Sequence, residues 1–243
     1  MNLYKRIIFT ILLISTIIVA VSFTTNCNSP IDDKVISYIA DAKSQNIAFY
    51  WKDDSGKVIR SIQNLKIYEK RKGKELVFAM NGGMFDPSYA PQGLYIEKYK
   101  ILKALDTSSG EGNFYLKPNG VFYITDNNIA AVCKTEDFID NGNIKYATQS
   151  GPMLIIDGEL HPALKEGSAN IQIRNGVGIL PDGKILFAIS TAKVNFFDFA
   201  SYFKSKGCKN ALYLDGFVSR MYLPEKLLKP KDGDFGVIIG ITK

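Results

Sequence analysis

The chain has 243 residues, of which 46% are hydrophobic and 22% are charged, a composition typical of one globular domain and unlike that of a long disordered segment. The formal net charge is +6, but the lysines are scattered and form no stripe, so the charge gives no support for nucleic-acid binding. His161 is the only histidine and the three cysteines form no CxxC motif, which argues against a zinc site built from these residues.

Residues 1–27 have the pattern of an export signal. Lys5 and Arg6 precede an unbroken apolar stretch from Ile7 to Val21, and small and polar residues follow. Three interpretations stay open: a cleaved signal peptide, a lipoprotein signal with an acylated Cys27, and an uncleaved membrane anchor. Each of them exports the rest of the chain, so we expect a periplasmic, cell-surface lipoprotein or secreted location.

Residues 28–46 are predicted to form a linker that runs into a short amphipathic helix, and residues 47–243 a single domain. Short apolar runs at 47–51, 75–80 and 93–105 predict strands separated by turns. Residues 119–132 and 175–189 each predict a β-hairpin, because the turns TDNN and PDGK hold the residues that favour tight turns.

One helix is clearly expected, at residues 195–208. Asn195 is its predicted cap, Phe196, Phe199, Ala200 and Phe203 form one apolar face, and Gly207 ends it. These elements predict an α+β domain with a mostly antiparallel sheet, and the many Phe and Tyr residues predict aromatic pairs within that sheet. Two alternatives stay open for Cys133 and Cys208: they form a disulfide with each other, or they are two small buried residues.

Polar and glycine residues stand where several apolar strands end. Asn81 and Gly82 follow the strand at 75–80, where glycine would let backbone approach a ligand, although Asn-Gly also forms plain hairpin turns. Ser150 and Gly151 precede Pro152, and they offer a hydroxyl and a free amide, or else only a turn.

Two charged residues are the strongest candidates for chemistry. If Ile171 and Ile173 point into the core, Arg174 lies on the opposite face of its strand, as a solvated residue or as a clamp on a phosphate or carboxylate. Asp215 ends the apolar run 211–214, and it is either a turn-starting aspartate or a group that acts on a substrate. Ser219 and Arg220, just after it, are candidate substrate-binding residues.

The ordered motifs NGGMF, SGPMLIIDG, RNGVGILPDG and ALYLDG resemble the phosphodiester glycosidase family, over roughly residue 47 to the C-terminus. The resemblance implies an α+β fold with a curved sheet and hydrolysis of a sugar–phosphate diester at the anomeric carbon. The cleft residues that it implies are Asn81, Gly82, Phe85, Ser150, Gly151, Arg174, Asp215 and Gly216.

The implied chemistry needs no cofactor, although a divalent ion held by Asp215 and backbone carbonyls is left open. Asp215 would stabilise the positive charge that develops on the sugar or would activate water, and Arg174, with Arg220 as a second cation, would neutralise the departing phosphate. After the aspartate, many relatives have glycines and serines where this chain has Phe217, Val218 and Arg220. Phe217 would narrow the site and Arg220 would add charge, which points to a different substrate.

The expected partner is a phosphorylated glycan or a sugar phosphodiester. Two other functions compete with hydrolysis. The chain could be a non-catalytic binding module for anionic glycans at the cell envelope, in which case the ligand binds without turnover. It could also be a structural protein of the envelope, in which these motifs are only turns.

Overall fold

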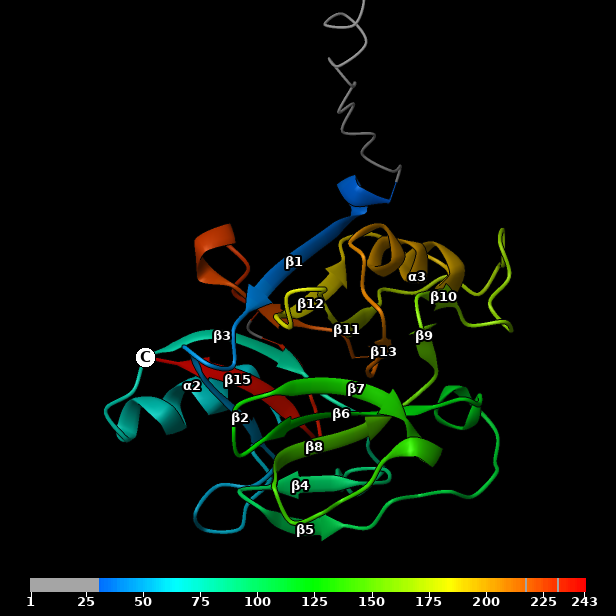
Figure 1. Ribbon diagram of the computed structural model, residues 1–243. Helices are drawn as coiled ribbons and strands as arrows, with labels where there is room; N and C mark the ends of the chain where they lie inside the picture. The colour runs from blue at the N-terminus through cyan, green and yellow to red at the C-terminus, as the bar shows by residue number, and fades with distance from the viewer. Residues whose placement is uncertain (1–30, 217, 231) are drawn as a thin grey trace, which may run out of the picture.

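The computed structural model describes residues 31–216, 218–230 and 232–243, and in this part of the chain three antiparallel sheets dominate (Figure 1). The first sheet has the order β1 (Val35–Ala40), β12 (Ile185–Ser190), β11 (Asn175–Ile179), β13 (Ala211–Tyr213), β9 (Met153–Ile156) and β10 (Glu159–Leu160). The second has the order β14 (Met221–Tyr222), β3 (Leu76–Asn81), β15 (Ile238–Thr242) and β2 (Asn46–Tyr50). The third has the order β5 (Lys100–Lys103), β4 (Tyr95–Glu97), β8 (Ile144–Ser150), β6 (Gly120–Thr125) and β7 (Ala130–Lys134).

Within the described residues, the other regular elements are four short 3-10 turns and two α-helices. The turns are η1 (Asp32–Lys34), η2 (Asn113–Tyr115), η3 (Thr135–Asp137) and η4 (Pro224–Lys226), and the helices are α2 (Ile62–Arg71) and α3 (Phe196–Ser205). The predicted α+β fold with mostly antiparallel strands is therefore confirmed, with the strands divided among three sheets.

Both predicted hairpins are present. β6 pairs with β7 and β11 pairs with β12, each across the expected turn. Each hairpin is then extended by a strand from further along the chain, β8 on β6 and β13 on β11. The hairpins are thus local units on which the first and third sheets are built.

The helix predicted at 195–208 is also confirmed. The Oδ1 atom of Asn195 accepts a hydrogen bond from the backbone N–H of Asp198 at 2.8 Å, and the predicted apolar face is buried. Gly207 follows the helix at a φ of +78°, which suits a residue without a Cβ.

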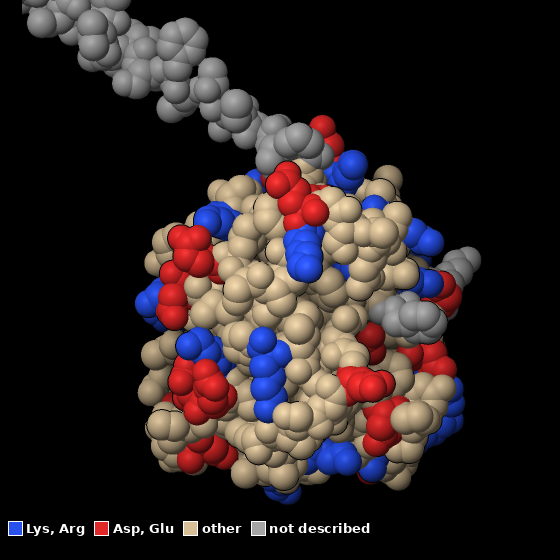
Figure 2. All heavy atoms as spheres, turned by 90° about the vertical axis from the view of Figure 1, so that its right-hand side faces the viewer, with Lys and Arg blue, Asp and Glu red and all other residues tan. Residues whose placement is uncertain are grey.

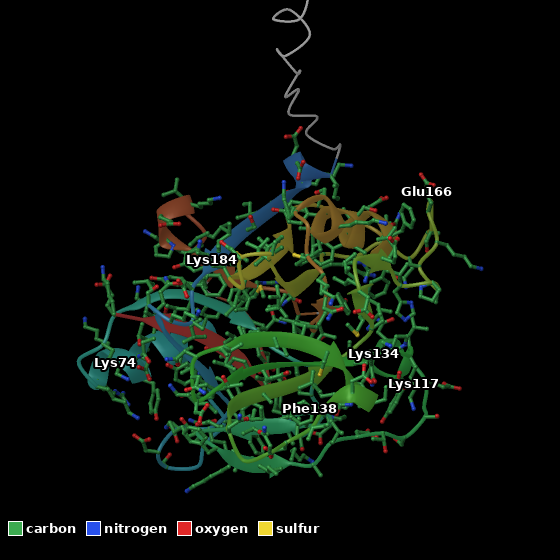
Figure 3. All side chains as sticks on the ribbon, viewed as in Figure 1. Lys74, Lys117, Lys134, Phe138, Glu166 and Lys184 are labelled. Carbon is green, nitrogen blue, oxygen red and sulfur yellow. The ribbon has the colours of Figure 1, made fainter. Side chains whose placement is uncertain are left out.

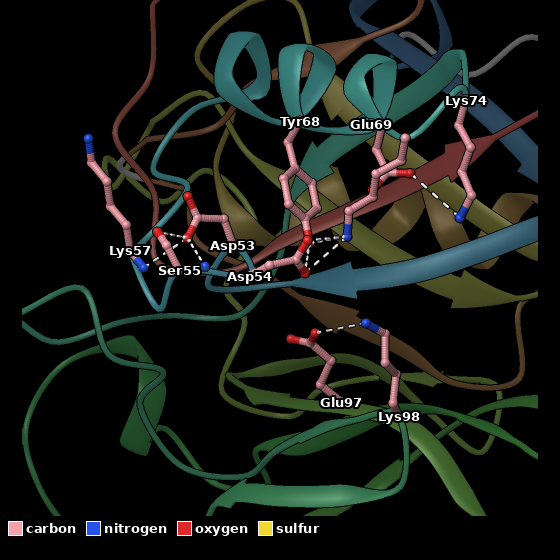
Figure 4. Close-up of polar contacts among 10 residues, drawn as sticks. Asp53, Asp54, Ser55, Lys57, Tyr68, Glu69, Lys74, Glu97 and Lys98 are labelled. Carbon is pink, nitrogen blue, oxygen red and sulfur yellow. Dashed lines mark hydrogen bonds and ion pairs between the residues drawn. The ribbon is translucent and has the colours of Figure 1, made fainter.

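Helix α2 was not predicted, and it covers β3 on the side of the molecule away from α3 (Figure 1). Ser61 caps it by accepting from the backbone N–H of Asn64. Figure 4 shows polar contacts that two side chains of the helix make: the Tyr68 hydroxyl donates to Asp54 at 2.7 Å, and Glu69 lies 3.7 Å from Lys74.

The short helix predicted within residues 28–46 is wrong. Residues 35–40 form strand β1, which pairs with β12 in unbroken register from Val35 opposite Ser190 to Ala40 opposite Ile185. The β-branched residues of this segment suit a strand, and β12 supplies hydrogen-bond partners that no helix of six residues would offset. The first sheet therefore begins before residue 47.

The core lies where the three sheets meet, and aromatic rings join them. Phe122 of the third sheet lies 5.5 Å from Phe49 of the second and 6.0 Å from Phe187 of the first. Phe187 in turn lies 5.0 Å from Phe78 of the second sheet. The expectation of aromatic pairs within one sheet is therefore corrected: these pairs form between sheets, because the inner faces of all three pack on one centre.

Cys133 and Cys208 are both free thiols, so the alternative of a disulfide between them is not realised. Among the residues described, no helix is long and apolar enough to cross a membrane. The predicted export signal and Cys27 lie outside the described residues.

Candidate active site

The end of β3 is joined to the loop after β13 through one asparagine. Asn81, the last residue of β3, is buried, and its Nδ2 donates to the backbone oxygen of Asp215 at 2.7 Å. Its Oδ1 accepts from the backbone N–H of Arg220 at 2.9 Å and from Nδ2 of Asn175 at 3.1 Å. The Asn81 amide is thus engaged with the chain itself, and it fixes the backbone on both sides of the loop.

Asn175 is a buried residue of this network that sequence reasoning did not single out. Besides the bond to the Asn81 side chain, its Nδ2 donates to the Asn81 backbone oxygen at 2.9 Å. Its Oδ1 accepts from the Ser219 hydroxyl at 3.1 Å. Ser219 is buried as well, so it too holds the loop in place. The asparagine in the RNGVG motif, directly after Arg174, was the signal available in the sequence.

Asp215 lies immediately beyond β13 with its backbone held on both sides. Its N–H donates to the Gly82 oxygen at 3.2 Å, and the N–H of Leu214 donates to the Asn175 oxygen at 3.1 Å. Gly82 is packed tightly, since a Cβ there would lie 2.7 Å from a methyl carbon of Val237. The Asp215 side chain is half-buried. A carboxylate on a backbone fixed by two sheets is well suited to act on a bound substrate.

Arg174 is fully buried, contrary to the usual position of a lone arginine on a sheet. Ile171 is 46% exposed, so the premise that it points into the core is wrong. The Arg174 Nε donates to the Val194 oxygen at 2.8 Å, and its Nη2 donates to the Asn170 oxygen at 2.6 Å.

The Arg174 guanidinium lies over the Phe196 ring, 3.5 Å from its centroid. Its Nη1 reaches the Tyr213 hydroxyl at 3.4 Å. No ion pair joins it to a carboxylate within the described residues, so neutral oxygens and an aromatic face surround a buried positive charge. Burial lowers the pKa of Arg174, while the contact with Tyr213 raises it.

Tyr213 connects the arginine to the aspartate loop. A Cβ on Gly216 would lie 1.6 Å from the Tyr213 hydroxyl oxygen, so only glycine fits there. The Tyr213 ring packs edge-on against Phe196 at 4.7 Å. Burial raises the pKa of Tyr213 to about 12, an effect that the charge of Arg174 opposes. The phenol therefore keeps its proton at neutral pH.

The Ser150–Pro152 turn adjoins the same place. The backbone N–H of Tyr213 donates to the Pro152 oxygen at 3.0 Å, and a Cβ on Gly83 would lie 2.5 Å from the Gln149 oxygen. Ser150 is fully buried, and its hydroxyl has no hydrogen-bond partner among the described residues. Gly151 is packed against the 113–119 segment, where a Cβ would lie 2.6 Å from the Phe114 oxygen. Ser150 and Gly151 thus lie beside β13 and the Gly82–Gly83 segment.

Phe85 lies further along the chain from Gly82, in the loop that follows β3. Its ring stacks on Tyr89 with centroids 5.6 Å apart, and a Cβ on Gly236 would lie 2.4 Å from its Cβ. No contact in the described structure joins Phe85 to Asp215 or Arg174, so it borders the site through its connection to Gly82 alone.

The sequence led us to expect that Arg220 adds a positive charge to the site, but the structure pairs this charge with the carboxylate of Asp232. Its Nε donates to the Asp232 carboxylate at 2.9 Å, its Nη2 also contacts that carboxylate, and its Nη1 donates to the Ser219 oxygen. The side chain also lines a groove of about 440 Å³ with Ile189 and Leu228. Its backbone, rather than its side chain, reaches Asn81: the Arg220 N–H donates to the Asn81 Oδ1, and the Arg220 oxygen accepts from the Asn81 backbone N–H at 3.4 Å. Phe217, which was expected to narrow the site, lies outside the described residues.

On the face that Figure 2 shows, Lys and Arg are interspersed with Asp and Glu. A groove of about 520 Å³ on this side includes Lys117 and Lys134, which Figure 3 labels, and its apolar wall includes Ile156 and Leu160. None of the expected site residues lines it. In the described part of the chain, no three His, Cys, Asp or Glu side chains are grouped as a metal ion would need.

Comparison with known proteins shows relatives of this chain in sequence and in fold. The chain is 39% identical over 190 residues to the uncharacterized protein YigE of Escherichia coli. The matched region covers 78% of this chain and 74% of that protein. Its fold matches the catalytic domain of zebrafish N-acetylglucosamine-1-phosphodiester alpha-N-acetylglucosaminidase, solved auto-inhibited by its pro-peptide, with a TM-score of 0.57 at 18% identity over 89% of this chain and 85% of that one.

A hypothetical protein from Synechocystis also has this fold, with a TM-score of 0.52 at 14% identity over 86% of this chain and 59% of that one. The sequence model of the phosphodiester glycosidase family matches residues 74–237, which span the segments that meet at the site: the end of β3, the Ser150 turn, Arg174 and the loop after β13. The chain belongs to the phosphodiester glycosidase family.

Proposed function

We propose that this chain is an exported hydrolase that cleaves the glycosyl–phosphate bond of a sugar-1-phosphodiester. The observation that carries the proposal is the Arg174 guanidinium, a buried positive charge without a carboxylate partner in the described residues, connected through Tyr213 to the loop that presents Asp215. Family membership supplies the reaction class. A positive charge with neutral neighbours attracts an anion, and a phosphodiester is an anion.

The reaction adds water to the anomeric carbon and breaks the bond from that carbon to the phosphate oxygen. The bonding electrons leave with the oxygen, which yields the free sugar and a phosphomonoester. Asp215 stabilises the positive charge that develops on the sugar, or takes a proton from the attacking water. Arg174 stabilises the departing phosphate, and its buried, weakly polar surroundings strengthen its field.

The experiment that tests the proposal is a panel of sugar-1-phosphodiesters, including N-acetylglucosamine linked through phosphate, with free sugar followed by mass spectrometry. Asp215→Asn is the test variant. Asp157→Asn is the matched control, because Asp157 also ends an apolar strand and precedes a glycine but is exposed at the β9–β10 turn. Sugar release by wild type and the control, but not by Asp215→Asn, supports the proposal. Full activity of Asp215→Asn contradicts it.

The same geometry also fits a second function. Arg174 is fully buried and most of its donors are already engaged, so its position is fixed, and a fixed positive charge can bind an anion without any turnover. In that case the chain is a non-catalytic binding module for anionic glycans. Binding of a substrate from the panel with no release of sugar, and with affinity unchanged in Asp215→Asn, would identify it.

Export rests on the sequence of residues 1–27, with Lys5 and Arg6 before the apolar stretch. Intact mass of the chain recovered from cells tests it. Loss of the first residues indicates a cleaved signal, and a lipid adduct that Cys27→Ser removes indicates a lipoprotein. Recovery of the full-length chain in the cytoplasm would contradict export.

A further inference from the structure

We propose that the hydroxyl of Tyr213 donates a hydrogen bond to the phosphate of the bound ligand, so that Tyr213 and Arg174 together form the anion-binding part of the site. The inference rests on the proposed function and deepens it by naming a further residue that recognises the phosphate. Tyr213 is part of the ALYLDG motif, but it was not among the residues expected to contact substrate.

The first argument is the unused donor of the phenol. The Tyr213 oxygen accepts from Nη1 of Arg174 at 3.4 Å and lies in direct contact with Gly216. The hydroxyl hydrogen is a separate donor, and no described residue accepts it. A buried donor that lacks a protein acceptor is costly unless a ligand or water accepts it.

The second argument is position. Tyr213 directly precedes Leu214 and Asp215, its oxygen touches the backbone at Gly216, and its N–H holds the Ser150–Pro152 turn. Ser150 is a second buried hydroxyl without a partner in the described residues. The Ser150 hydroxyl without a partner and the Tyr213 hydroxyl, whose hydrogen is not donated to a described residue, lie on segments joined by one hydrogen bond. Together with an arginine that has no carboxylate partner in the described residues, they match the donors that a phosphate needs.

The third argument is protonation. The pKa of Tyr213 is raised by burial, so the phenol stays a donor across the physiological range. Donation requires no proton transfer: the hydrogen remains on Tyr213 while the phosphate oxygen gains negative charge. The hydrogen bond strengthens as the leaving group departs, since bonds to charged acceptors are stronger than bonds to neutral ones.

The test measures binding of methyl phosphate, the simplest phosphomonoester, to Tyr213→Phe by calorimetry. The substitution removes only the oxygen and keeps the ring packed against Phe196. The control is Tyr202→Phe, which removes a buried phenol from α3. A hydrogen bond to a charged group predicts that Tyr213→Phe weakens binding by about tenfold or more at pH 7.5, while Tyr202→Phe leaves it within about twofold.

The same measurement at pH 5.0 separates donation from a purely structural role. Methyl phosphate loses one of its two charges near pH 6, so the ratio of variant to wild-type dissociation constants is expected to shrink at pH 5.0. An equal ratio at both pH values, a ratio within about twofold at pH 7.5, or no binding of methyl phosphate to wild type would overturn the inference. Activity is read separately: weakened binding without sugar release from wild type overturns the proposed function alone, and sugar release unaffected by Tyr213→Phe with unchanged binding overturns the inference alone.

Discussion

Asn81→Ala is expected to damage both stability and the site, because one amide holds the loop of Asp215 to the end of β3. The substitution leaves the backbone oxygen of Asp215 without its 2.7 Å donor and the backbone N–H of Arg220 without its 2.9 Å acceptor. Asn175 also loses its side-chain contact, but it retains the Asn81 backbone oxygen. Two backbone groups therefore lose a partner.

The magnitude follows from these two groups. A buried polar group left without a partner costs about 1–3 kcal/mol, so two of them would give at most about 2–6 kcal/mol, and the Asp215 oxygen keeps a 3.4 Å hydrogen bond from the Ser219 hydroxyl. Both bonds are only partly buried, and water can replace part of what is lost. We therefore expect a loss of about 2–4 kcal/mol, a large share of the roughly 5–15 kcal/mol that stabilises a typical domain.

Urea denaturation measures this loss, followed by the fluorescence of Trp51, the only tryptophan of the chain. The matched control is Asn210→Ala, since the Asn210 side chain also bridges two segments, donating to Val132 and accepting from Asp157, but at a part-exposed place away from Asp215. The control is expected to lose about 1–2 kcal/mol and to keep full sugar release. A loss below about 1 kcal/mol in Asn81→Ala with activity intact would refute the reasoning.

Three further predictions concern other parts of the fold. Gly216→Ala places a Cβ 1.6 Å from the hydroxyl oxygen of Tyr213, so we expect a loss of about 1–3 kcal/mol in urea denaturation together with loss of sugar release; a fully active variant would show that the loop adapts freely. Burial lowers the pKa of His161, the only histidine, so the unfolded chain binds the extra proton first and the free energy of unfolding falls as the pH drops below about 6.5. His161→Asn keeps a hydrogen-bond acceptor and is expected to flatten this dependence, measured as melting temperature between pH 5 and 7.5; the same slope in wild type and variant would contradict the assignment. Burial raises the pKa of Cys133 to about 11 and of Cys208 to about 12, so a thiol reagent is expected to modify both only in urea, and rapid labelling of the folded chain would be the contrary result.

Local signals in the sequence predicted the two hairpins and the helix α3, whose contacts form between residues that are close in the sequence. The turns at 125–128 and 181–184 and the cap at Asn195 act over a few residues, and each hairpin or helix formed as expected. Strand β1 was mistaken for a helix because its partner, β12, is about 150 residues away in the sequence. Helix α2 could have been found from Ser61 and the buried Ile62 and Leu65, which have the spacing of one helical face.

The site was only partly visible from sequence for the same reason. Asp215 could be placed at a strand end from the apolar run before it. The burial of Arg174 could not be predicted from the sequence, because the groups around it come from Asn170, from Phe196 on α3 and from Tyr213 on β13. Such surroundings are set by how distant segments pack, and no local pattern encodes them.

Strand β15 has a consequence for the order in which the protein matures. It contributes no residue to the site, yet it pairs with both β2 and β3, and β3 carries Asn81. During synthesis, residues 81, 175 and 215 all leave the ribosome before residues 238–242 do. Strand β3 therefore lacks its neighbour β15 until those last residues emerge. The pairing of β3 is therefore complete only when residues 238–242 have been made, and a nascent chain or one truncated before β15 lacks this support for Asn81.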